Sequence, residues 1–155
     1  MKPLDEHPEL GQTLRAMRIL VRTIAAGLAI FLGVVAYLHY GQGQDTPPEN
    51  AGLLTNVALA VAGLLVVGSG MVRTLMMRKA LAAWAEGDIR GFQQRYTAAV
   101  IAAAAMIEGA GFLLATAFLV EKNVMALTAG VLCLLVLLAA VPTRGKLNML
   151  LEMTR

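Results

Sequence analysis

The chain has 155 residues, of which 58% are hydrophobic, 15% are charged and 5% are aromatic. A typical soluble domain is about 45–50% apolar and about 25% charged, so this composition argues against an ordinary soluble enzyme domain. It also argues against a disordered chain, which would combine low hydrophobicity with a high net charge. The balance indicates an integral membrane protein, for which the lipid bilayer is the first partner.

The N-terminal part of the chain is polar, and we expect residues 1–9 to form a flexible tail. Apolar residues then recur at helical spacing, at Leu10, Leu14, Met17 and Val21. This pattern predicts an amphipathic lead-in over residues 10–22, which runs along the membrane surface before the chain enters the bilayer.

Four long runs of the sequence are almost free of charged residues. Each is close to the roughly 17–25 apolar residues that a helix needs to cross a bilayer, and a helix satisfies its own backbone hydrogen bonds there. The four predicted spans are, approximately, residues 23–39, 52–72, 96–120 and 124–142. Residues 73–95 would connect the second span to the third. The sequence thus predicts one membrane domain over residues 1–155, an all-α four-transmembrane-helix bundle.

The basic residues predict how this bundle is oriented. Twelve of the thirteen Lys and Arg residues fall on the side of the two termini and the 73–95 connection. By the positive-inside rule that side is cytoplasmic, so we expect a multi-pass plasma-membrane protein with both termini inside the cell. The pI of about 9.4 is then a consequence of topology, and no nucleic-acid partner is expected.

The two halves of the chain share short sequence patterns. Phe31-Leu32 resembles Phe112-Leu113, and Asn56-Val57 resembles Asn123-Val124, each with further matching residues downstream. Duplication of a helical hairpin explains these matches, and so does chance similarity between apolar segments.

Glu108 is the residue that most needs an explanation, because it lies at the midpoint of the third predicted span. At roughly 1.5 Å per residue it is about 18 Å from either end, too far for its carboxyl to reach the headgroups. A charged side chain at this depth costs at least about 2.5–3.5 kcal/mol, and no Lys or Arg lies in any predicted span. Glu108 is therefore a candidate ion-binding residue or a candidate interhelical hydrogen-bonding residue.

Small residues at helical spacing are candidate packing positions. Such residues let membrane helices approach closely, within one chain or between chains. The candidates on the third span are Ala98, Ala102, Ala105 and Gly109, and those on the second are Gly63, Gly68 and Gly70. We expect self-association, or packing beside a larger membrane complex.

The sequence offers little for catalysis or metal binding. No nucleophile is accompanied by a base and an orienting group, so we expect no enzymatic activity and no cofactor. His7 and His39 fall on opposite sides of the predicted membrane, so no metal site is predicted. Cys133 lies inside the fourth predicted span and is interpreted as a packing residue.

The segment from Ala102 to Leu119 is similar to the ion-binding helix of rotary ATPase proteolipid (c) subunits, with Glu108 at the carboxylate position. End to end, with Ile-Glu-Gly-Ala-Gly-Phe in the third span and Val-Pro-Thr-Arg after the fourth, the chain resembles a group of uncharacterised four-helix bacterial inner-membrane proteins. The first resemblance implies a proton or cation site at Glu108. The second implies a bacterial inner-membrane location and no known activity.

Two functions are therefore predicted from the sequence. The first is a structural or accessory membrane protein that packs through small-residue helix faces. The alternative is a proteolipid-like subunit that binds a proton or a cation through Glu108.

Overall fold

The computed structural model describes residues 8–41 and 52–152, and within these ranges it is entirely helical, without strands. The predicted tail before residue 8 and most of the loop between the first two spans lie outside the described residues. The helices are α2 (Pro8–Gly41), α3 (Leu53–Ala85), α4 (Ile89–Glu121), α5 (Val124–Ala139) and α6 (Arg144–Glu152).

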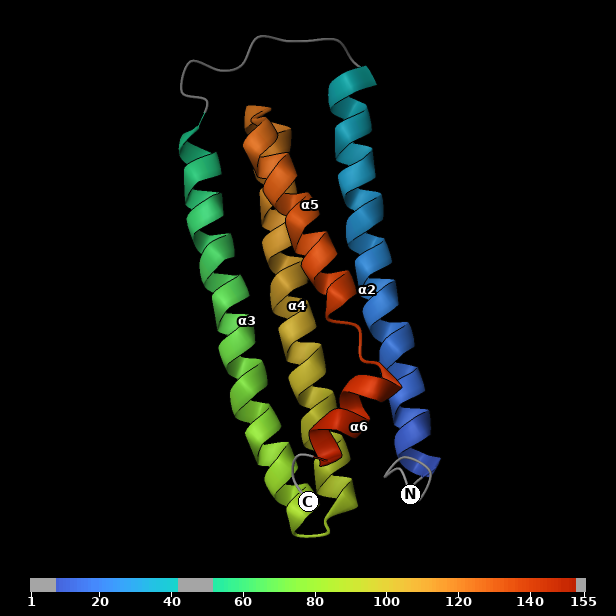
Figure 1. The fold of residues 1–155 in the computed structure, drawn as a ribbon. Helices are drawn as coiled ribbons and strands as arrows, with labels where there is room; N and C mark the ends of the chain where they lie inside the picture. Colours follow the sequence, from blue (N-terminus) through green and yellow to red (C-terminus); the bar gives the residue numbers. More distant parts are fainter. Residues whose placement is uncertain (1–7, 42–51, 153–155) are drawn as a thin grey trace.

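Helix α4 is the centre of the bundle. It packs along α3, α5 and α2, whereas α2 and α3 lie on opposite sides of it (Figure 1). Successive long helices run in opposite directions, so Pro8 and Glu152 lie at the same end of the molecule (Figure 1). We refer to this end as the basic end, because ten of the Lys and Arg residues within the described ranges belong to the helix turns and connections there.

Three helices, α2, α3 and α4, are each long and apolar enough to cross a membrane. The fourth predicted span corresponds to α5, which has 16 residues and is bent by 64° relative to α6 across a short break. Pro142 lies in this break, and proline cannot supply the backbone N–H that a continuing helix requires. The structure thus has three apolar helices of spanning length, or four if α5 and α6 form one bent span.

The segment predicted as a separate lead-in is continuous with the first predicted span, because α2 is one helix of 34 residues. Its apolar stripe faces protein: Leu10, Leu14, Met17 and Val21 are all buried. Helix α6 lies across the basic end of the bundle (Figure 1) and buries Leu147 and Leu151 in the same core. Packing within the chain therefore satisfies the amphipathic pattern of residues 10–22.

The connection between the second and third predicted spans is almost wholly helical. Helix α3 continues to Ala85, and a turn with Gly87 at φ 78° reverses the chain. The Asp88 side chain then caps α4 by accepting a hydrogen bond from the backbone N–H of Gly91 at 2.9 Å. Glycine is suited to the left-handed conformation of this turn, and aspartate is a preferred helix cap.

Two glycines allow α2, α4 and α5 to pack closely. A Cβ on Gly111 of α4 would lie 2.6 Å from a methyl group of the fully buried Leu28 of α2. A Cβ on Gly130 of α5 would lie 3.0 Å from Leu32 of α2 and 3.7 Å from the backbone oxygen of Gly111. Where these three helices meet, Leu28 and Leu32 of α2 leave no room for a side chain at Gly111 or Gly130.

Candidate functional site

One face of α4 is left uncovered by the other helices, and we refer to it as the open face. Its small residues Ala98, Ala105 and Gly109 are exposed, and Ala102 is half-buried. No atom of another helix lies within 4 Å of a Cβ built on Gly109. The core side of α4 uses a different set of small residues: Ala99, Ala103, Ala104, Ala110 and Ala115.

The open face therefore contains all four predicted packing residues of the third span. Within the described chain they are not the residues that hold α4 against its neighbours. This arrangement leaves their small side chains available to a helix from outside the chain, or to lipid.

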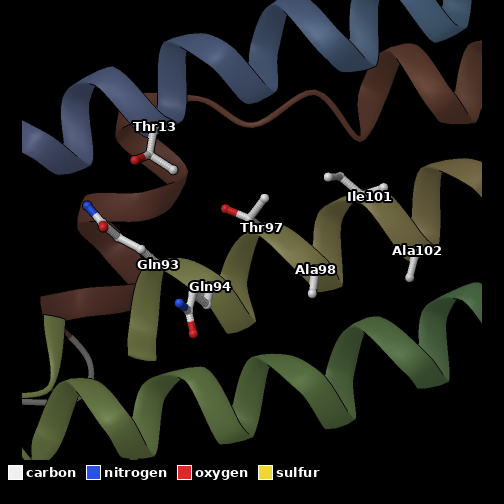
Figure 2. A pocket seen from close by; sticks show the side chains of 7 residues that line it. All are labelled: Thr13, Gln93, Gln94, Thr97, Ala98, Ile101 and Ala102. Atoms are coloured by element: carbon white, nitrogen blue, oxygen red, sulfur yellow. The ribbon is translucent and has the colours of Figure 1, made fainter. Parts of the chain in front are cut away.

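A groove hollows the open face near the basic end. It has a volume of 680 Å³. Six of its lining residues come from α4, and Thr13 of α2 closes one side (Figure 2). Figure 2 shows Thr97 and Ile101 directed toward the α2 side, and Ala98 and Ala102 directed toward the α3 side. Gln93 and Gln94 add amide groups at the end of the groove.

Glu108 lies on α4 at the α2 margin of the open face. Its side chain is half-buried, and its Oε1 lies 4.0 Å from the point that a Cβ on Gly27 of α2 would occupy. Within the part of the chain that the structure describes, the Glu108 carboxyl has no hydrogen-bond or ion-pair partner. The carboxyl therefore lies beside the exposed Gly27 of α2 at ordinary contact distance.

Several hydroxyl groups of the long apolar helices form hydrogen bonds within their own helix and not with Glu108. Thr23, Thr116 and Thr128 each donate to the carbonyl four residues earlier in their own helix. Ser69 donates to the carbonyl of Val66 at 2.7 Å. The carboxyl of Glu108 thus lies on the side of the bundle with its hydrogen-bonding capacity unused by these groups.

The glycines predicted as packing residues on the second span differ from one another. A Cβ on Gly68 would lie 2.9 Å from the terminal methyl of Met106 on α4, so Gly68 does lie at a close helix contact. Gly63 and Gly70 are exposed, and nothing lies within 4 Å of a Cβ built on either.

Among the described residues the buried glutamate is Glu121, the last residue of α4, which lies just beyond the third predicted span. Its Oε1 accepts a hydrogen bond from the backbone N–H of Leu54, and its Oε2 accepts one from the N–H of Thr55, both at 2.7 Å. The carboxylate of α4 therefore caps the N-terminus of α3, where the N-cap residue Gly52 has no side chain to do so.

The cap controls the charge of Glu121, which lies one residue beyond the third predicted span. Burial raises the pKa of the carboxyl, but the hydrogen bonds that it accepts from the backbone N–H groups of Thr55 and Leu54 outweigh this effect. The pKa is consequently below its usual range, and the carboxylate stays charged. A negative charge at a helix N-terminus is also favoured by the helix dipole.

Other chemical groups add no site to this picture. Cys133 is buried as a free thiol. Among the described residues, His, Cys, Asp and Glu side chains form no group of three that could hold a metal ion. The arrangement offers helix contacts and two carboxyls, one used as a cap and one unpartnered.

Comparison of the chain with protein-family models, with curated proteins and with solved structures found no match.

Proposed function

We propose that the protein is a non-enzymatic, multi-pass membrane protein that self-associates through the open face of α4. The observation that supports this proposal is the exposure of Ala98, Ala105 and Gly109 in a fold that buries other alanines of the same helix. Small exposed residues in a membrane helix permit close backbone approach by a second helix, where packing rather than the hydrophobic effect drives association.

A second copy of the chain fits this face better than an unrelated helix does. Copies inserted in the same orientation have identical residues at the same depth, so the small residues of the two open faces would meet across a two-fold axis. Packing against a larger membrane complex is the competing outcome of the same test.

The membrane setting that we propose is the bacterial inner membrane, with α5 and α6 together forming a fourth, bent span. The basic end would lie in the cytoplasm, as the positive-inside rule predicts, and both termini with it. The common end of Pro8 and Glu152 supports termini on a single side (Figure 1).

The test is to purify the protein in several mild detergents and to measure the mass of the protein particle after the contribution of bound detergent has been subtracted. We expect a dimer or higher oligomer for the wild type and a shift toward monomer for Ala105→Leu, which fills the open face. Ala29→Leu is the matched control, because Ala29 is also an exposed alanine but belongs to α2 and not to the open face. A wild type that is monomeric in every detergent and in native membranes would contradict self-association.

The second candidate function is proton or cation binding at Glu108. It is favoured by one observation, the half-buried carboxyl that has no partner within the described residues and lies beside Gly27. A carbodiimide, which modifies carboxyls buried in a membrane, should then label Glu108 in a pH-dependent way that added cation blocks. If no added cation changes the labelling, cation binding at Glu108 is contradicted.

A further inference from the structure

A second pocket lies at the basic end, between the cytoplasmic turns of α3 and helix α6, and has a volume of 310 Å³. It is lined by Arg73, Thr74, Met77, Arg78, Leu81 and Leu150. The residues from α3 fall at positions 73 and 74, at 77 and 78, and at 81, each group about one turn after the last, so they line one side of that helix over about two turns.

The lining combines charge with apolar surface. Met77 is buried and Leu81 and Leu150 are half-buried, so they form an apolar wall shared by α3 and α6. Arg73 is half-buried and Arg78 is exposed, and they lie five residues apart on the same helix, about 1.4 turns. The pocket thus places two guanidinium groups beside an apolar surface.

The two arginines make no hydrogen bond and no ion pair within the described chain, and the charge of Arg73 acts electrostatically on Tyr96 of α4. The described carboxylates at this end, Glu9, Glu86, Asp88 and Glu152, do not pair with either arginine. Other cations of this end are used inside the fold: Arg95 donates to the carbonyl of Lys79 at 3.0 Å, and Lys146 to that of Ala139 at 2.8 Å. The charge of Arg73 and Arg78 is therefore available to a ligand.

The position of the pocket along α3 indicates what it would meet. Residues 51–72 carry no charge, and Arg73 follows them directly. In the proposed membrane setting this is the depth at which acyl chains give way to headgroups, where arginine heads reach the phosphates.

We propose that this pocket binds one anionic phospholipid of the cytoplasmic leaflet. Arg73 and Arg78 hold its phosphate, and an acyl chain lies against Met77, Leu81 and Leu150. Guanidinium groups bind phosphate oxygens in a bidentate way, and basic pockets between membrane helices suit such headgroups. The apolar wall selects a whole lipid over a free phosphate ion. The proposal depends on the membrane placement given above but is independent of self-association.

The test is native mass spectrometry of the full chain in a neutral detergent. Phosphatidylglycerol, phosphatidylcholine with the same acyl chains, and glycerol 3-phosphate are added separately. We expect phosphatidylglycerol to be retained about fivefold or more over phosphatidylcholine, and glycerol 3-phosphate to bind weakly. Arg73→Gln with Arg78→Gln should lower retention of phosphatidylglycerol to that of phosphatidylcholine.

The matched control is Arg15→Gln with Arg22→Gln, which removes the same charge from two exposed arginines of α2. It should keep the preference, and so should Arg73→Lys with Arg78→Lys in large part. Circular dichroism checks that each variant remains helical. An equal loss in the control pair, equal retention of the two lipids, or equally strong binding of glycerol 3-phosphate would each overturn the proposal. Loss of self-association with lipid binding intact would contradict only the proposed function.

Discussion

The carboxylate of Glu121 closes the N-terminus of α3, with its Oε2 lying 2.7 Å from the backbone nitrogen of Thr55. The two residues come from neighbouring antiparallel helices, so one side chain both caps α3 and joins its first turn to the end of α4. This contact lies at the opposite end of the bundle from α6 (Figure 1).

The first prediction concerns the charge of this cap. Because the pKa of Glu121 is lowered by folding, its stabilising effect is complete above the ordinary carboxyl pKa of 4.5 and is lost as the pH falls through the lowered value. In thermal unfolding in detergent, followed by circular dichroism, the midpoint temperature should therefore fall once the pH is lowered below about 4.5. Glu121→Gln should lower the midpoint at pH 7 and weaken this acid dependence. The same acid profile in wild type and variant would contradict the cap.

The second prediction compares two glycines of α4. Gly111→Ala should destabilise the bundle by about 1–3 kcal/mol, because its Cβ would overlap the fully buried Leu28. Gly109→Ala should leave stability unchanged or raise it by up to about 1 kcal/mol, because alanine favours helix and its Cβ meets open space. Denaturant unfolding of the two variants measures the difference. Equal stabilities would show that α2 and α4 pack less closely than described.

The third prediction separates the two roles of Glu108. In a structural role, Glu108→Gln keeps a group that can hydrogen-bond, so assembly should weaken by no more than about 0.6–2 kcal/mol. Glu108→Ala should weaken assembly further. If Glu108 binds a proton or a cation, Glu108→Gln should assemble normally but lose carbodiimide labelling and any cation dependence, because an amide cannot release a proton. Wild-type assembly and ion dependence in Glu108→Ala would contradict both roles.

The fourth prediction concerns orientation. In a Cys133→Ala background, Gln44→Cys should react with an impermeant thiol reagent added outside the cell, whereas Glu86→Cys should react only after the membrane is opened. In the turn between α3 and α4, Glu86 is the better position for the cysteine, because the positive φ of the nearby Gly87 disfavours any side chain. The reversed labelling pattern would contradict a cytoplasmic basic end.

Much of the fold could be predicted from charge and hydropathy, because lipid forces each long apolar run into a helix. The absence of charges in residues 51–72 indicated α3, and the run around Glu108 indicated α4. Pro142 also marked the end of the last apolar run, but the 64° bend into α6 depends on how α6 packs against the bundle.

The positions of side chains were harder to predict, since apolar helices in a membrane have no strong polar face to indicate which side is inward. Alanines occur on every side of α4, so the sequence did not distinguish buried Ala99 from exposed Ala98. The roles of Gly111 and Glu121 depend on which helix lies opposite, which composition and spacing do not encode.

The most direct test of the open face as an interface is disulfide crosslinking in native membranes. Ala105→Cys in a Cys133→Ala background places one thiol on this face, and Leu132→Cys places one on an exposed side of α5 as the control. Two-fold packing through the open face brings the Ala105 positions within the roughly 4.4–6.8 Å between Cα atoms that a disulfide needs. We predict rapid formation of a dimer through residue 105 and slow or no formation through residue 132. Crosslinking through residue 132 alone, or through neither position, would contradict self-association by this face.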